Sequence, residues 1–535
     1  MFQFLKHLEF VRRGFCPQQP RRVYEEGKFS AFFERSPLVT ALIAITSFAL
    51  ILAIMGFYYE FVVVRDKFFL TALIFLASMA YLKIVHPEIV RDNSKLLLVS
   101  TAVILNLAIT KGMFVGFKYY DSDIFSFYYV PTAFAPLLIS TLLGPSVAMF
   151  VVIFLSLLIG CMVPDKEFQM LGISLLTGIM AVYFTQDVRK RSHFIRAGIY
   201  VGLTSMVCAL AFGLTSDMDV TALMSGNFLS NQGIRMLLIQ SLGGAVVGVF
   251  WALMVNGVLP VFENVFKITT KISWLEMTDV SHPLLKEMAI RAPGTYHHSL
   301  SVANLSESAA EAVGANPLVC RVGSYFHDVG KLVKPDYFIE NMNLEMGNPH
   351  DKLTPNMSAL IIASHVKEGV DMALKHGLNR EIIDIIREHH GTSLIYFFYR
   401  RAKLHEQDTA AGCKIMDMNL SDIPRVDEST FRYPGPKPQT RESGIVSICD
   451  TIEAASRSLH KPTPQSIEQL VREVIDTKLL DGQLDECHLS VYDLRVIHEK
   501  LVFLLTNMMH SRISYPKNDQ NPTTAKGKIT AFRAG

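Results

Sequence analysis

The chain has 535 residues, 50% of them hydrophobic, and a mean hydropathy of +0.28. This composition excludes an ordinary soluble protein and indicates that part of the chain lies in a lipid bilayer. The 51 basic and 49 acidic residues leave a net charge of +2, so the overall charge does not indicate a DNA or RNA polymer as a partner.

The first half of the chain is a series of apolar stretches. The first 36 residues contain seven Lys or Arg, which predicts a cytoplasmic N-terminal segment, because basic residues are retained on that side of the membrane. A helix needs about 20 apolar residues to cross the hydrocarbon core. The sequence predicts about eight spans, at 37–58, 68–86, 95–115, 127–144, 147–163, 168–186, 197–214 and 236–259.

A basic loop at 187–196 sets the predicted orientation. With eight alternating spans this loop is cytoplasmic, and the chain returns to the cytoplasm at about residue 260. We find no Asp, Glu or Arg deep in a predicted span, which disfavours a pump or transporter, because such proteins need ionisable groups at membrane depth. We therefore predict a transmembrane domain at 37–259, in contact with membrane lipid, and a linker at 260–280.

The pattern changes after the linker to amphipathic helices joined by short turns, which predicts an all-α domain at 281–510. The stretch 420–439 is predicted to be a loop. The polar tail at 511–535 is predicted to be disordered. Helices are predicted at 291–314, 316–328, 354–376, 379–390, 440–458, 464–478 and 488–509.

Histidine is concentrated in this second domain, because only His7, His86 and His193 of the 17 precede position 282. Five imidazoles and two carboxylates fall on the buried faces of the predicted helices: His298, His327, Asp328, His365, His389, His390 and Asp450. A single inward histidine is more often a core residue bonded to a carbonyl. Seven such groups are costly to satisfy pairwise, and shared metal ions remove that cost.

Seven ligands exceed what one tetrahedral ion needs and suit two divalent ions with a bridging carboxylate. Asp328 fits the bridge, because it directly follows His327, which diverges by roughly 100° around the helix. Imidazole and carboxylate ligands favour Mn or Fe, with Zn, Co and Ni left open. Cys449 points about 100° away from Asp450 and is excluded as a ligand.

The order of these residues matches the H…HD…H…HH…D signature of HD-domain phosphohydrolases with two metals. Five segments narrow the match further: HPLLKEMAIRAPGTYHHSLSVANLSE, FHDVGKLVKPDYFIEN, SHVKEGVDMAL, HHGTSLIYFFY and FRYPGPKP. Through these segments, residues 260–510 resemble the membrane-bound seven-transmembrane HD family, the PgpH-type cyclic di-AMP phosphodiesterases. The membrane half resembles it more loosely. Soluble HD-GYP proteins fit poorly, because GTSLIYFFY follows His390 in place of a Gly-Tyr-Pro segment.

The resemblance implies a multi-pass protein of the bacterial inner membrane whose cytoplasmic domain hydrolyses cyclic di-AMP to linear pApA. It implies that His298, His327, Asp328 and Asp450 hold one ion and that Asp328, His365, His389 and His390 hold the other. Asp328 and Lys331 are the predicted catalytic residues. Lys331 would balance charge on a phosphate oxygen, and the alternative for it is a solvated lysine at a helix end. The aromatic run 396–399 is predicted to be a loop that recognises a base, although apolar core is the commoner use of such a run.

The sequence departs from the family at one place. Family members carry a large extracytoplasmic domain after the first span, whereas only YYEFVVVRDK at 58–67 stands here. The resemblance therefore does not extend to control by an external ligand. Two other functions stay open: an HD hydrolase of cyclic di-GMP or guanosine tetraphosphate, and a non-enzymatic membrane receptor that binds a nucleotide. The sequence is also compatible with a homodimer.

Overall fold

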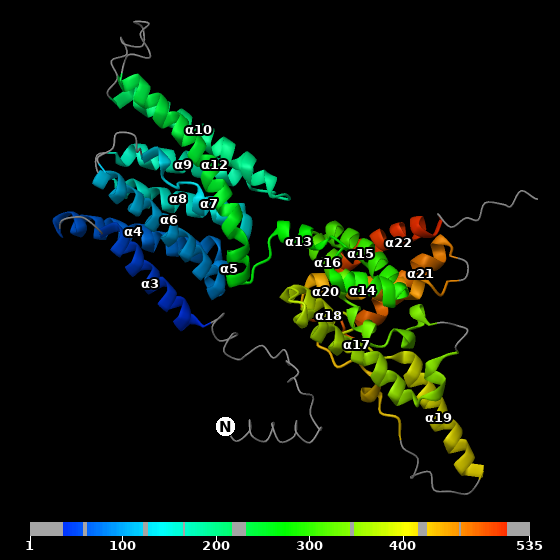
Figure 1. Cartoon of the computed structure of the whole chain (residues 1–535). Coiled ribbons are helices and arrows are strands. Elements are labelled where there is room, and N and C mark those ends of the chain that lie inside the picture. Colours follow the sequence, from blue (N-terminus) through cyan, green and yellow to red (C-terminus); the bar gives the residue numbers. More distant parts are fainter. Residues whose placement is uncertain are drawn as a thin grey trace, which may run out of the picture. The chain divides into compact units, whose positions relative to one another are not determined.

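The computed structural model describes residues 36–56, 61–120, 127–163, 166–216, 232–342, 347–415, 425–459 and 462–510. Within these residues the chain is helical and has no β-strand, and a single isolated bridge joins Leu394 to Arg432. The chain divides into two compact units, Met1–Asp279 and Val280–Gly535 (Figure 1). The predicted all-α fold is confirmed. The predicted N-terminal segment, apart from Ser36, and the predicted tail lie outside the described residues.

The first unit is a bundle of long apolar helices. Seven of the described helices are long and apolar enough to cross a membrane, within the ranges Pro37–Gly56, Phe68–Val85, Asn93–Gly116, Pro145–Met162, Glu167–Phe184, Ser192–Phe212 and Ile234–Phe266. They belong to α3 (Pro37–Gly56), α4 (Phe61–Val85), α6 (Asn93–Tyr120), α8 (Pro145–Met162), α9 (Glu167–Phe184), α10 (Ser192–Ser216) and α12 (Gln232–Phe266). The shorter helices are α5 (Pro87–Arg91), α7 (Phe134–Leu143) and α13 (Lys271–Met277).

The fourth predicted span, 127–144, is not a full span. Its only α-helix is α7, which has ten residues and is too short to cross a bilayer. Before α7 comes the short 3-10 helix η1 (Phe127–Tyr129) and then Pro131, which disfavours helical backbone in the residue that precedes it. The sequence pattern detected the apolar character of this segment but not its break.

The segment before α7 lies at the middle of the bundle. The indole Nε1 of Trp251, halfway along α12, donates to the carbonyl of Tyr129 at 3.3 Å. The hydroxyls of Thr132 and Thr177 are 2.7 Å apart. At the other end of α7, Ser140 donates to the carbonyl of Thr185, directly after α9. The helix therefore runs from the middle of the bundle to one end, which matches the half-helices that membrane proteins tolerate inside a protein interior.

Helices α10 and α12 approach each other closely through small residues. Gly198 and Gly202 on α10, and Gly244 and Gly248 on α12, are each spaced by four, so each pair shares a helix face. A Cβ added at Gly202 would lie 2.2 Å from the carbonyl oxygen of Ala245. Only glycine fits there, and the two backbones pack in the manner typical of membrane helices.

The second unit is a cluster of shorter helices, and residues at the start of several of these helices favour helix formation there. Proline occupies the first turn of several of them, where its missing N–H costs nothing. Asn316, Thr354, Thr440 and Thr463 accept backbone N–H bonds as N-caps. The helices are α14 (Pro283–Arg291), α15 (Pro293–Val313), α16 (Pro317–Phe326), α17 (Pro355–Lys375), α18 (Arg380–Glu388), α19 (Tyr396–Ile415), α20 (Arg441–Ser456), α21 (Pro464–Leu480) and α22 (Val491–His510).

Helix α15 is at the centre of this unit and packs against α16, α20 and α22. Its apolar face contributes Val302 and Leu305 to a core shared with Ile448 and Ile452 of α20, all fully buried. His298, one turn before Val302, therefore faces the same interior. Burial of this apolar face fixes the helix rotation that aims the imidazole inward.

A short 3-10 helix, η2 (Val329–Val333), follows Asp328 and packs directly on α17. The contact depends on two glycines. A Cβ added at Gly330 would lie 1.9 Å from the carbonyl oxygen of His365 and 2.5 Å from the amide nitrogen of Gly369. The Gly in the His-Asp-Val-Gly-Lys segment therefore lets the Asp328 turn approach the helix that carries His365.

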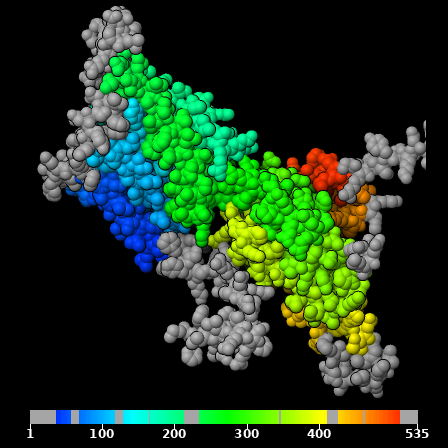
Figure 2. Space-filling model, in the orientation of Figure 1, coloured from blue at the N-terminus to red at the C-terminus, as the bar shows by residue number. Residues whose placement is uncertain are grey.

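The run Tyr396–Tyr399 begins helix α19 and is not a loop. This helix projects from the rest of its unit (Figures 1 and 2). Phe398 and Tyr399 pack into a small core with Phe431, while Tyr396 and Phe397 are exposed to solvent. The helix was not predicted, because a dense aromatic run followed by Arg-Arg has no clear amphipathic period.

Candidate metal centre

The seven residues that the sequence singles out lie together in the second unit. His298 is on α15, His365 is on α17 and Asp450 is on α20. The others stand where helices end: His327 and His389 are C-caps, and Asp328 and His390 follow them. The structure forms two groups that could hold a metal ion, whose ligand atoms all lie within 4.8 Å of one another in each group.

The first group consists of His298, His327, Asp328 and Asp450. The Nε2 atom of His298 is 3.0 Å from Oδ1 of Asp450 and 3.5 Å from Oδ2 of Asp328. The Nε2 atom of His327 is 3.3 Å from the same Oδ2 of Asp328 and 3.6 Å from Oδ1 of Asp450. Two imidazole nitrogens thus face two carboxylates, and all four side chains are buried.

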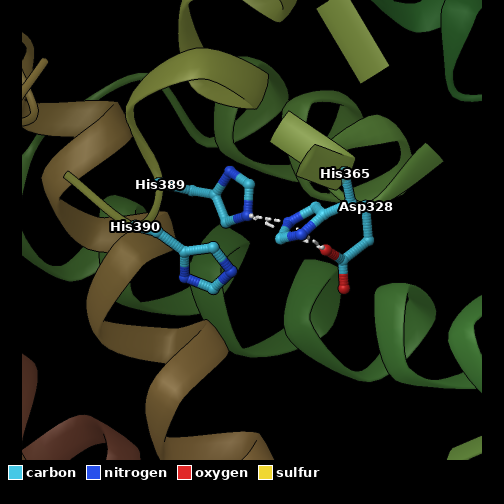
Figure 3. Close-up of side chains that lie close together, drawn as sticks. All are labelled: Asp328, His365, His389 and His390. Carbon is cyan, nitrogen blue, oxygen red and sulfur yellow. Dashed lines mark hydrogen bonds and ion pairs between the residues drawn. The ribbon is translucent and has the colours of Figure 1, made fainter. Parts of the chain in front are cut away.

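The second group consists of Asp328, His365, His389 and His390 (Figure 3). Oδ1 of Asp328 is 3.4 Å from Nε2 of His365 and 3.7 Å from Nε2 of His389. The two Nε2 atoms are 3.4 Å apart. Figure 3 shows the rings of His365 and His389 converging near the Asp328 carboxylate, with His390 beside them.

Asp328 belongs to both groups and presents a different oxygen to each. Oδ2 faces His298 and His327, and Oδ1 faces His365 and His389. Oδ1 of Asp328 and Nε2 of His327 are buried and have no hydrogen-bond partner among the described residues. Burying such atoms without a partner is costly, and a cation between them would remove the cost. The donor set of imidazole and carboxylate is one that divalent transition metals accept.

Three of the imidazoles are held by backbone carbonyls. The Nδ1 atom of His327 is 2.7 Å from the carbonyl oxygen of Ser324. The Nδ1 atom of His365 is 2.6 Å from the carbonyl oxygen of Ile362. The Nδ1 atom of His389 is 2.8 Å from the carbonyl oxygen of Ile386. Because a carbonyl can only accept, each Nδ1 must donate. Each Nε2 therefore faces the centre, as a metal ligand requires.

The surroundings lower the pKa of the shared carboxylate and also lower the pKa of an imidazole in the second group. Burial raises the pKa of Asp328, but the charges of His327 and Lys331 outweigh this and hold the pKa well below its ordinary value. Burial, together with the charge of the neighbouring His327, lowers the pKa of His389 to about 3. At neutral pH the carboxylate is ionised and the imidazole is neutral, which are the forms that bind cations.

Lys331 lies one turn beyond Asp328 and is paired with carboxylates. Its Nζ is 2.7 Å from Oδ2 of Asp328 and 2.8 Å from Oε1 of Glu340. Glu340 also accepts from the hydroxyl of Thr295 at 3.0 Å. Lys331 is therefore fixed at the edge of the centre, with its ammonium against the shared carboxylate. The sequence did not indicate Glu340, because it lies outside any predicted helix.

A cavity of about 560 Å³ opens beside the two groups. Its lining includes His298, His365, His390, Asp450 and Lys331. The aromatic residues that reach it are Phe338 and Tyr433, and none of the run 396–399 does, so the prediction that this run recognises a base is not supported by its position. Tyr433 stacks on His390, with ring centroids 4.2 Å apart. It belongs to the FRYPGPKP segment, which was the available sequence signal for it.

The fold and the centre together define a class: helical membrane proteins with a second, all-α unit that carries an HD-type centre. The membrane unit matches the family described as 7TM receptor with intracellular HD hydrolase over residues 61–270, and the second unit matches the HD domain family over residues 295–455. The chain belongs to this family of membrane-bound HD proteins, as the sequence resemblance predicted.

Two curated relatives carry the same name. The cyclic-di-AMP phosphodiesterase PgpH of Bacillus subtilis (strain 168) is 38% identical over 453 residues, which are 83% of this chain and 59% of that protein. The cyclic-di-AMP phosphodiesterase PgpH of Listeria monocytogenes serotype 1/2a is 36% identical over 390 residues, which are 72% of this chain and 50% of that protein. The chain therefore spans little more than half the length of these relatives.

A solved structure is also similar. The crystal structure of the L. monocytogenes phosphodiesterase PgpH HD domain in complex with cyclic-di-AMP is 42% identical in sequence, with a TM-score of 0.39. The match covers 43% of this chain and 98% of that chain.

Proposed function

We propose that the chain is a membrane-anchored, two-metal phosphodiesterase that hydrolyses a cyclic dinucleotide, most specifically cyclic di-AMP to pApA. One observation carries the proposal: the two oxygens of Asp328 face two separate ligand groups at the edge of one cavity. A carboxylate shared in this way is typical of centres that cleave phosphate esters with two ions.

The two groups fit Mn or Fe, because both consist of imidazole and carboxylate without a thiolate. His298, His327, Asp328 and Asp450 would hold one ion, and Asp328, His365, His389 and His390 the other. When bound, such ions supply Lewis-acid stabilisation of phosphate oxygens and lower the pKa of bound water.

The protein's own side chains set the conditions for in-line attack at phosphorus. Asp328 is held by Lys331, and Lys331 is held by Glu340, so neither catalytic candidate moves freely. The Lys331 ammonium lines the cavity and offers positive charge to a non-bridging phosphate oxygen there. A charge that is already in position needs no reorganisation when the transition state forms. Stabilisation by such preorganised charges is usually the largest contribution to catalysis.

The cavity supports a nucleotide substrate. Its size is within the range of small-molecule sites, and Phe338, Ile362 and Tyr433 give it apolar and aromatic walls beside the charged centre. Aromatic faces stack on nucleobases irrespective of sequence. The preference for adenine is supported by the names of the two PgpH relatives.

We also propose that the HD unit is cytoplasmic. The basic loop after α9 lies beside the chain segment that leaves the membrane unit, since Arg191 pairs with Glu276 at 2.8 Å and Lys271 with Asp187 at 3.3 Å. Clustered Arg and Lys at this end of the bundle favour the cytoplasmic face. The exposed apolar side chains of the spans, such as Leu38, Ile45 and Leu73, support contact with membrane lipid.

The test uses the full chain purified in detergent with manganese. It should convert cyclic di-AMP to pApA, measured by chromatography, and should act less efficiently on cyclic di-GMP and guanosine tetraphosphate tested side by side. An Asp328→Ala chain should be inactive. Equal activity of that variant would refute the two-metal mechanism, and metal-dependent binding without turnover would favour a receptor. A fluorescent-protein fusion after residue 535 should fluoresce if the second unit is cytoplasmic.

A further inference from the structure

His298 differs from His327, His365 and His389 in what holds its outer nitrogen. His327, His365 and His389 each donate Nδ1–H to a backbone carbonyl. His298 instead bonds, through Nδ1, the carboxylate oxygen Oε2 of Glu453, a residue 155 positions away on α20. The Nε2 atom of the same ring faces Asp450 and Asp328. One imidazole thus joins a ligand group on one side to a carboxylate on the other.

Glu453 is itself fixed and buried. Its second oxygen, Oε1, accepts two bonds from Arg457, one turn further along α20, from Nε at 2.9 Å and from Nη2 at 2.6 Å. The side chain of Glu453 is 8% exposed, whereas that of Arg457 is 41% exposed. Both residues line the cavity. The arginine therefore holds the carboxylate in place from the solvent side, and the histidine holds it from the interior.

We propose that Glu453 is a positioning residue for one ion of the pair, with Arg457 as its anchor. This inference rests on the proposed two-metal function. A carboxylate that accepts Nδ1–H fixes the ring and the tautomer and makes Nε2 a stronger donor. Among the four imidazoles held through Nδ1, only His298 has a charged acceptor.

The consequence is an asymmetry between the two ions. The group His298, His327, Asp328 and Asp450 receives the support of Glu453, and the group of His365, His389 and His390 with Asp328 does not. Losing an outer carboxylate of this kind commonly weakens metal affinity by roughly 10- to 100-fold. Substitution of Glu453 should therefore weaken the binding of one ion and leave the binding of the other unchanged.

The test measures manganese in the full chain in detergent after dialysis against graded concentrations of a competing chelator. Wild type should retain two ions per chain. Glu453→Gln keeps an acceptor but loses the charge, so one ion should be lost at about tenfold lower chelator. Glu453→Ala loses both, and the shift should approach about 100-fold. In electron paramagnetic resonance, the signal of a coupled Mn(II) pair should give way to that of an isolated ion.

Glu307→Gln is the matched control, because it removes a carboxylate paired with Arg321 in the same unit, about two and a half turns along α15 from His298. It should retain both ions as wild type does. A Glu453→Ala chain that retains both ions like wild type overturns the inference and leaves the two-metal function intact. Loss of both ions together also overturns it, because support would then not be specific to one. A wild-type chain that binds no manganese overturns both.

Discussion

The shared carboxylate gives the sharpest prediction, because changing one residue should empty two sites. Asp328→Asn preserves the size of the side chain and removes its charge. Both oxygens of Asp328 face ligand groups, so each ion loses its contact with the same negative charge. His365→Ala removes a ligand from the second group alone. We expect Asp328→Asn to lose both ions and His365→Ala to lose one.

The size of the effect follows from the geometry. Two unit charges 4 Å apart interact by about 4 kcal/mol at an effective dielectric constant of ~20. A dication gains at least this much from the Asp328 charge, and about 4 kcal/mol corresponds to a roughly thousandfold change in affinity. The remaining charge differs between the groups, since Asp450 is a member of the first group, whereas it only adjoins the second, with Oδ2 at 3.6 Å from Nδ1 of His390. The second ion should therefore dissociate first.

The assay counts manganese per full chain by mass spectrometry at increasing chelator concentrations, with cyclic di-AMP hydrolysis measured on the same samples. Asp351→Asn is the control, because this exposed carboxylate lies in the same unit outside both groups. If Asp328→Asn retained one ion with unchanged affinity, Asp328 would not be shared between two ions. The bridging role would then be wrong, even if activity were lost.

Three further predictions follow from packing and burial. Gly330→Ala adds a Cβ 1.9 Å from the carbonyl of His365, so it should separate Asp328 from His365 and lower manganese retention, measured with the same chelator series. Gly202→Ala adds a Cβ 2.2 Å from the carbonyl of Ala245, so it should lower the thermal stability of the membrane unit in detergent without changing metal content. Burial lowers the pKa of Lys478 from 10.5 to about 8. The folded chain therefore holds this proton less tightly than the unfolded chain, so the free energy of unfolding should rise between about pH 8 and pH 10.5. The Lys478→Met chain should therefore have a higher free energy of unfolding than wild type at pH 7, by up to about 3 kcal/mol. This difference should disappear by pH 10.5. A difference that stayed constant across this pH range would contradict the burial argument.

Much of the centre could be predicted from the sequence, because its side chains carry local signals. Val302 and Leu305 fix the inward face of α15 through helical period alone, and the same reasoning places His298 with them. The eight apolar stretches were also recognisable by composition. What average composition does not reveal is the break before α7. The whole stretch 127–144 is apolar on average, whereas Pro131 signals that the helix does not run through it. Glu340 was missed because it lies outside any predicted helix. Glu453 was missed for another reason: its importance comes from His298, which is 155 positions away in the sequence.

The imidazoles themselves illustrate this limit. His327, His365 and His389 each bond the carbonyl three residues earlier, at Ser324, Ile362 and Ile386, so their ring orientation is a property of the local helix. For His327 and His389 these carbonyls belong to the last turn of a helix, where no later amide competes for them. His298 lies within the second turn of α15 and takes its acceptor from α20. Three ligands are therefore oriented as soon as their helices form, whereas the fourth is oriented only when α15 and α20 pack together, so one ion's site depends on the tertiary fold more than the other's.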